Sequence, residues 1–153
     1  MEMSRIERLR LFWLENFLEF LDGAAPRRKQ MPPHLVIGRR GERAALFYLR
    51  RLGFVITACG WKTPKARGDL DLIAWENGVL CFVEVKTRTT RAIAPAEAAV
   101  DADKKQMLRK MAHYYLRQVP NRDVAVRFDI LSIYFEAGKT ADFQLFRGAF
   151  GWD

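Results

Sequence analysis

The spacing of hydrophobic side chains along the chain predicts an alternation of helices and strands. Apolar residues recur at helical intervals over three stretches, which are residues 4–22, 34–52 and 101–118. Runs rich in β-branched and aromatic residues predict strands at residues 54–61, 70–75, 79–87, 124–135 and 142–146. A short helical turn is expected at residues 96–100. The order α-α-β-β-β-α-β-β favours an α/β fold in which helices pack on a mixed sheet.

Local signals fix several ends of these elements. Asp101 is a suitable N-cap for the helix that follows it, and Gly53 is placed to end the helix before it. The tripeptide Glu76-Asn77-Gly78 is a strong hairpin signal between two apolar runs. The strands 70–75 and 79–87 are therefore predicted to be antiparallel neighbours.

The first predicted helix differs from the others because it is apolar nearly all round. Residues 1–33 are expected to form this N-terminal helix and a linker rich in Pro and Arg, and residues 34–153 an α/β domain. The helix must dock on the domain, on another subunit or on a membrane surface. Its apolar stretch is too short to span a bilayer.

The charge distribution points to an acidic partner. The chain has 153 residues and a net charge of +8, and Glu42 is the single acid among eleven Lys and Arg between residues 24 and 68. Such a basic run suits the phosphates of a nucleic acid, although a merely solvated basic surface explains the composition equally well. Cys59 and Cys81 are isolated within apolar runs, which predicts reduced core residues in a cytoplasmic protein.

Three charged residues converge at the end of the predicted hairpin. Glu84 and Lys86 share one face of their strand, and the hairpin brings Asp71 opposite Glu84 or within a residue or two of it. Two carboxylates and a backbone carbonyl such as that of Val85 would suit Mg²⁺ or Mn²⁺, with a nearby ammonium to orient water. The alternative is a half-buried Glu84–Lys86 ion pair with Asp71 capping a turn. Three such groups in a basic protein favour the metal site.

Four sequence blocks together resemble a known family. They are Gly38-Arg39-Arg40-Gly41-Glu42, Gly68-Asp69-Leu70-Asp71-Leu72-Ile73-Ala74, Phe82-Val83-Glu84-Val85-Lys86-Thr87-Arg88 and Arg127-Phe128-Asp129. Over residues 35–147 the chain is similar to the YraN family of bacterial predicted endonucleases. That family resembles archaeal Holliday-junction resolvases and falls in the PD-(D/E)xK nuclease superfamily.

This resemblance implies a restriction-endonuclease-like core and a metal-dependent endodeoxyribonuclease that uses Mg²⁺ or Mn²⁺. Asp71, Glu84 and the carbonyl of Val85 would hold the metal, while Lys86 would orient water and Glu42 would add an acid from the preceding helix. Leu70 stands where the superfamily pattern has Pro. Asp69 replaces a common Glu and is expected to close a turn, and Asp129 to pair with a basic neighbour.

The expected partner is nucleic acid, with DNA favoured over RNA and branched or distorted DNA as the substrate. Six cations are expected to contact it, namely Arg39, Arg40, Arg43, Arg88, Lys104 and Lys105. A homodimer and no membrane association are also expected. Two rival functions remain, a non-catalytic nucleic-acid-binding module that retains the nuclease fold and an interaction protein that works through its apolar first helix.

Overall fold

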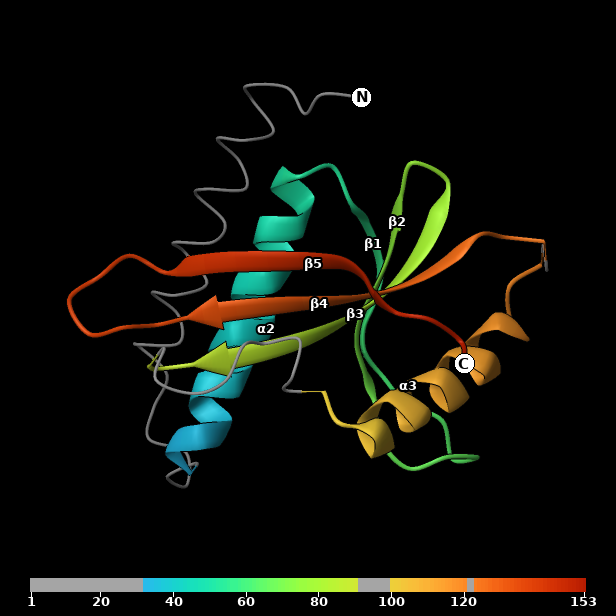
Figure 1. Cartoon of the computed structure of the whole chain (residues 1–153), viewed down its shortest axis with the longest axis horizontal. Helices are drawn as coiled ribbons and strands as arrows, with labels where there is room; N and C mark the ends of the chain where they lie inside the picture. The colour runs from blue at the N-terminus through green and yellow to red at the C-terminus, as the bar shows by residue number, and fades with distance from the viewer. Residues whose placement is uncertain (1–31, 91–99, 121–122) are drawn as a thin grey trace, which may run out of the picture.

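A five-stranded sheet with one helix on each face forms the part of the chain described by the structure, a computed structural model covering residues 32–90, 100–120 and 123–153 (Figure 1). The elements are α2 (Pro33–Arg51), β1 (Val55–Trp61), β2 (Leu70–Glu76), β3 (Val79–Arg88), α3 (Ala102–Leu116), β4 (Val126–Tyr134) and β5 (Asp142–Phe150). The predicted N-terminal helix, its linker up to residue 31 and most of the predicted helical turn at 96–100 lie outside the described residues.

The sheet is mixed, as the order of elements predicts. Its strands lie in the order β1-β2-β3-β4-β5, and only β3 and β4 are parallel. The β2–β3 hairpin closes on the pair Glu76 and Val79, with Asn77 and Gly78 both at positive φ (50° and 80°). Positive φ at both central residues is the type I′ geometry that matches strand twist, so the hairpin prediction is confirmed.

Two hydrophobic cores hold the layers together. On one face Ala45 and Leu49 of α2 pack on the sheet, and on the other Leu108 and Met111 of α3 do so. The helix α3 follows β3 and precedes its parallel neighbour β4, so it is the crossover that a parallel pair requires. Every strand of the hairpin is therefore covered on both sides, and the charged end of the hairpin lies between the two helices.

Most element boundaries agree with the sequence predictions, with two differences. Asp101 caps α3 by accepting a 2.8 Å hydrogen bond from the backbone N–H of Lys104, and Gly53 follows α2 at a φ of 93°. However, α3 ends at Leu116 rather than at residue 118, and β5 continues to Phe150 rather than ending at residue 146.

One prediction about the core is wrong. Cys81 is fully buried, but Cys59 is exposed. Cys59 lies on β1, an edge strand with half-open faces, so the apolar run around it does not indicate burial. Among the described residues, no helix is long and apolar enough to cross a membrane.

Candidate metal centre

The register of the β2–β3 hairpin brings Asp71 to Glu84. The last pair of the ladder is Leu72 with Val83, and one further step in the same register aligns Asp71 with Glu84. At this step the Asp71 side chain takes the place of a backbone partner, since its Oδ2 accepts a 2.8 Å hydrogen bond from the N–H of Val85. The Asp71 carboxylate is thereby held against the backbone of β3, beside Glu84.

Glu84 is buried and only half satisfied. Its side chain is 3% exposed, and its Oε1 lies 2.9 Å from Nζ of Lys86 and 3.0 Å from Nζ of Lys104. Its second oxygen, Oε2, is buried and has no hydrogen-bond partner. Lys104 comes from the first turn of α3, so the crossover helix supplies a cation to the carboxylate at the end of the hairpin.

Four carboxylates lie within electrostatic reach of one another. Burial, followed by the charge of Glu84, raises the pKa of Asp71 from 3.8 to about 7, against the opposing effects of the Val85 N–H and Lys104. Partial burial of the Glu42 carboxyl on α2, followed by the charges of Asp69 and Glu84, raises the pKa of Glu42 despite the nearby Arg39. The two helices and the hairpin thus concentrate negative charge at one end of the sheet.

A close helix–strand contact brings Glu42 to this end. A Cβ added to Gly41 would lie 1.8 Å from Oγ1 of Thr87 and 3.0 Å from its Cβ. Only glycine allows α2 to approach β3 this closely, and Glu42 is the next residue of the helix. Asp69 faces Lys62 at 3.7 Å, which agrees with its expected place at the turn of residues 62–68.

The backbone of Val85 completes a set of oxygen atoms. The N–H and C=O of a residue in an extended strand point to the same edge, and the Val85 N–H points to Asp71. The Val85 carbonyl therefore faces the same side as the two carboxylates. Within the described ranges no group of three His, Cys, Asp or Glu side chains is arranged to hold a metal ion, so a site here would depend on Asp71, Glu84 and backbone oxygen.

The unpaired polar atoms of the described residues belong to the second half of β3 and to its neighbour β4. Three buried side-chain atoms have no hydrogen-bond partner, and they are Glu84 Oε2, Arg88 Nε and Ser132 Oγ. Ser132 is fully buried on β4 and is the register partner of Lys86. Arg88 ends β3 and lines a pocket of about 360 Å³ together with Glu42 and Val85. An unpaired buried polar atom costs about 1–3 kcal/mol, so three such atoms on two neighbouring strands are not expected of a purely structural arrangement.

The predicted nucleic-acid contacts divide into exposed and engaged cations. Arg39 is exposed on α2, and the Arg40 guanidinium lies 4.3 Å from the centre of the Phe135 ring. Lys105 lies 5.8 Å from the centre of the Phe150 ring. The structure places Lys104 on Glu84, so this residue belongs to the charged centre rather than to an outer surface. In the sequence Lys104 is only a lysine near the start of a predicted helix, and nothing in that position indicates a contact with Glu84.

A second group of charges, which is formed by Glu76, Arg127, Asp129 and Arg147, is fully paired. Asp129 is fully buried and accepts hydrogen bonds from Nε and NH2 of Arg127 and from the Gly148 N–H, with the first and last at 2.8 Å. Arg127 and Arg147 both bind Glu76, and the hydrogen bonds from Arg147 hold the pKa of Glu76 below its ordinary value. The predicted pairing of Asp129 with a basic neighbour is confirmed, and its role is to bind β5 to the sheet.

Comparison with known sequences places the charged centre inside a matched family region. The chain matches the family described as Uncharacterised protein family UPF0102 over residues 41–133. A UPF0102 protein of Koribacter versatilis is 48% identical over 122 residues, which cover 80% of this chain and 84% of that protein. A UPF0102 protein of Solibacter usitatus is 41% identical over 81% of this chain and 91% of its own length. A UPF0102 protein of Porphyromonas gingivalis is 40% identical over 70% of this chain and 77% of its own length.

Proposed function

The chain belongs to the UPF0102 (YraN) family, and on that premise we propose that it is a metal-dependent endonuclease that hydrolyses DNA phosphodiester bonds. The proposal includes a restriction-endonuclease-like PD-(D/E)xK core, since the five-stranded sheet carries Asp71, Glu84 and Lys86 at one end of a hairpin. The observation that carries it is the buried, unpaired Oε2 of Glu84 beside a second carboxylate whose pKa is raised to about 7.

The donor set fits Mg²⁺ or Mn²⁺. Two carboxylates and a carbonyl are hard oxygen ligands, which these ions prefer, and a cation would neutralise the crowding that raises the pKa of Asp71. Asp71, Glu84 and the Val85 carbonyl would hold the ion. When bound, such an ion polarises a phosphate oxygen and lowers the pKa of a coordinated water.

The side chains around the carboxylates can serve the same reaction. Lys86 lies 2.9 Å from Glu84 and is 27% exposed, so its ammonium is held at the carboxylate and still accessible to substrate and water. There it can orient an attacking water or stabilise negative charge that develops on the phosphate. Lys104 holds Glu84 in place from α3, and Glu42 can accept a proton from water that enters from the side of α2.

The phosphate contacts of the proposed enzyme come from arginines of α2 and from Arg88 at the end of β3. Arg88 lines a pocket with Glu42 and Val85, so its guanidinium can bind a phosphate that enters this pocket. Arg39, Arg40 and Arg43 precede or follow Glu42 on α2. Reversing these three arginines to Glu should weaken DNA binding and flatten its salt dependence, since each lost phosphate contact removes about 0.9 from the slope.

The test is cleavage of a DNA panel by the full chain. Linear, nicked, flapped and four-way DNAs are incubated with and without Mn²⁺, and Lys86→Ala is compared with wild type and with Lys139→Ala, whose ammonium pairs with Glu136 in the β4–β5 turn. We expect Mn²⁺-dependent cleavage that falls at least about 100-fold in Lys86→Ala and is unchanged in Lys139→Ala.

DNA affinity should change little in Lys86→Ala, because one phosphate contact of several is lost. If the wild-type chain binds DNA but cleaves none of the panel in Mn²⁺ or Mg²⁺, the proposal is wrong, and the non-catalytic binding module is the better description.

A further inference from the structure

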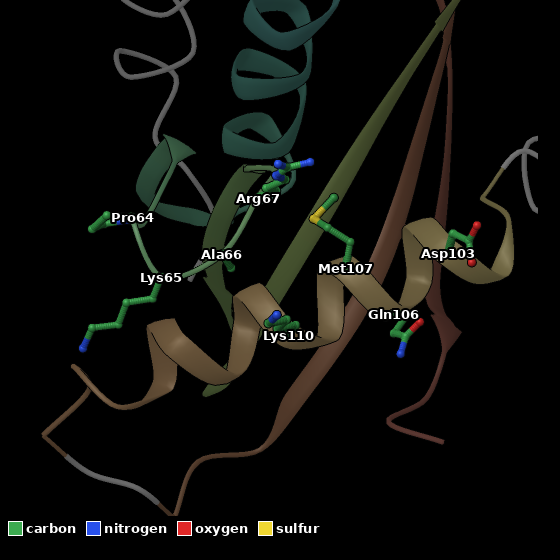
Figure 2. A pocket seen from close by; sticks show the side chains of 8 residues that line it. All are labelled: Pro64, Lys65, Ala66, Arg67, Asp103, Gln106, Met107 and Lys110. Carbon is green, nitrogen blue, oxygen red and sulfur yellow. The ribbon is translucent and has the colours of Figure 1, made fainter.

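A pocket of about 590 Å³ lies beside the charged centre, between the turn that precedes β2 and the helix α3. Residues 64–67 of the turn form one wall, and Asp103, Gln106, Met107 and Lys110 of α3 form the other (Figure 2). Its volume is within the range of about 300–1,000 Å³ that small-molecule sites usually have. The proposed reaction uses none of these residues.

Both walls of the pocket continue along the chain into residues near the two carboxylates, Asp71 and Glu84. The turn packs on α3 where Gly68, at a φ of 102°, leaves room for Met107, since a Cβ on Gly68 would lie 2.5 Å from the Met107 Sδ. The residue after Gly68 is Asp69, near the start of β2. On the helix side, Asp103 is followed by Lys104, whose Nζ binds Glu84. A chain that lies across the carboxylates would therefore meet the pocket with its next units.

The cations of the pocket are available to a ligand. Lys65, Arg67 and Lys110 are all exposed, and no ion pair with an acid is found for any of them in the part of the chain that the structure describes. This distinguishes them from Lys86 and Lys104, which are engaged by Glu84. One acid, Asp103, lines the pocket against three cations, so the pocket has the charge that a phosphodiester backbone requires.

The remaining lining suits a nucleobase rather than phosphate alone. Pro64, Ala66 and Met107 provide apolar surface, and the Met107 side chain extends from α3 toward the turn (Figure 2). Gln106 and Asp103 offer hydrogen-bond donors and acceptors of the kind that read base edges. A base that remains paired in a duplex has its Watson–Crick edge and both its faces occupied, so only an unpaired base can place them in such a pocket.

We propose that this pocket binds one unpaired nucleotide of the DNA strand next to the proposed cleavage site. The base rests on Met107, Ala66 and Pro64, and the flanking phosphates contact Lys65, Arg67 and Lys110. The inference rests on the proposed nuclease function and names its substrate class, which is DNA with unpaired nucleotides beside the scissile phosphate.

The experiment measures DNA binding without cleavage. Full-length protein is titrated in Ca²⁺ with labelled single-stranded, flapped and fully paired DNA over a range of salt concentrations. Lys65→Gln/Arg67→Gln/Lys110→Gln is compared with a control variant that loses the same charge elsewhere, Arg50→Gln/Arg117→Gln/Lys139→Gln. A third variant, Ala66→Leu, fills the base region of the pocket and leaves the charges unchanged.

We expect the pocket charge variant to lose about 10- to 100-fold in affinity for single-stranded and flapped DNA at about 0.1 M salt, with a salt slope lower by up to about 2, since each phosphate contact on a single strand contributes about 0.7. The control variant should lose much less. Ala66→Leu should reduce the preference for flapped over paired DNA without changing the salt slope.

The outcomes separate this inference from the proposed function. If the wild-type chain binds and cleaves DNA while the pocket and control variants lose equal affinity, the pocket is not a nucleotide site, although the nuclease proposal stands. If the pocket charge variant loses the same affinity for paired and for flapped DNA, the pocket is a phosphate-binding surface, and the proposal that it binds an unpaired base is wrong. Wild-type protein that binds RNA but no DNA, or no nucleic acid at all, would overturn both proposals.

Discussion

Replacing Asp71 by Asn tests the electrostatics of the charged centre without the need for a substrate. Burial and the charge of Glu84 raise the pKa of Asp71 from 3.8 to about 7 in the folded protein. Because the folded state holds the proton more tightly than the unfolded chain, ionising Asp71 destabilises the fold. The contribution of Asp71 to the free energy of unfolding is most favourable below about pH 4. It is lost as the pH rises from about 4 to 7, and it does not change further above about pH 7.

The size of the effect follows from the shift. A pKa unit corresponds to about 1.4 kcal/mol, so a rise from 3.8 to about 7 sets an upper limit of roughly 4 kcal/mol. Asp71 is half-buried, and water at its open side reduces the effect, so about 1–3 kcal/mol is the range to test. An Asn side chain keeps the volume, and its Oδ1 can still accept the hydrogen bond from the Val85 N–H.

The assay is urea unfolding of the metal-free full chain at pH 4.5, 6 and 8. Asp71→Asn should match wild type near pH 4.5 and exceed it in unfolding free energy at pH 8. The same change at Asp69, whose carboxylate is 40% exposed and faces Lys62 at 3.7 Å, should alter stability by less than about 1 kcal/mol at every pH. Mn²⁺ should stabilise wild type and Asp69→Asn but not Asp71→Asn. A stability difference between wild type and Asp71→Asn that does not depend on pH would refute the reasoning.

Three further predictions concern packing, pairing and assembly. Gly41→Ala should cost about 1–3 kcal/mol by overpacking, and Thr87→Ala should restore most of it in the double variant, as a thermal-melt cycle would show. Asp129→Asn removes the fully buried carboxylate that pairs with Arg127, leaves Glu76 as the acid bound to Arg127, and should cost about 3–5 kcal/mol in urea unfolding, with no change in Mn²⁺ affinity. The full chain should sediment as a homodimer, and a chain that begins at Met31 as a weaker dimer or a monomer, because the helix predicted from sequence at residues 4–22 has more apolar side chains than one docking face buries.

The hairpin shows how much of the site can be predicted from sequence. Asn77-Gly78 fixes a two-residue turn, and a two-residue turn fixes the register of the strands on both sides. Strand alternation then gives the face of each side chain. Two local rules therefore predict that Asp71 lies beside Glu84, and one hydrogen bond from Val85 is enough to close the arrangement.

The contacts that the sequence did not predict all join segments far apart in the chain. Lys104 reaches Glu84 because the crossover helix begins at the end of the sheet, and Gly41 meets Thr87 because α2 crosses β3 at that residue. Neither contact leaves a periodic signal, since each depends on how a helix is placed on the sheet. The sequence also predicts that Cys59 is buried, whereas it is exposed, because an apolar run does not distinguish an edge strand from a central one.

The length of β5 illustrates a local signal that a distant residue overrides. Arg147 and Gly148 interrupt the apolar run, and the sequence predicts a strand that ends at residue 146, before both of them. In the structure Gly148 has a φ of 61°, and β5 nevertheless includes it. In the structure the Gly148 N–H donates to Asp129 at 2.8 Å across an irregularity in the β4–β5 register. The buried carboxylate replaces a ladder hydrogen bond, and the strand continues to Phe150.

The two groups of buried charge are satisfied to different degrees, and the difference bears on function. Asp129 and Glu76 are each bound by arginines, so the charges of this group balance within the protein. On β3, by contrast, Glu84 keeps an unpaired oxygen and Arg88 keeps an unpaired nitrogen. The same fold is thus able to satisfy buried charges, and it leaves one unpaired atom on Glu84, next to Lys86, and another on Arg88 at the end of β3. A divalent cation for the first and a phosphate for the second are the complementary partners, and a phosphodiester with its metal ion supplies both at once.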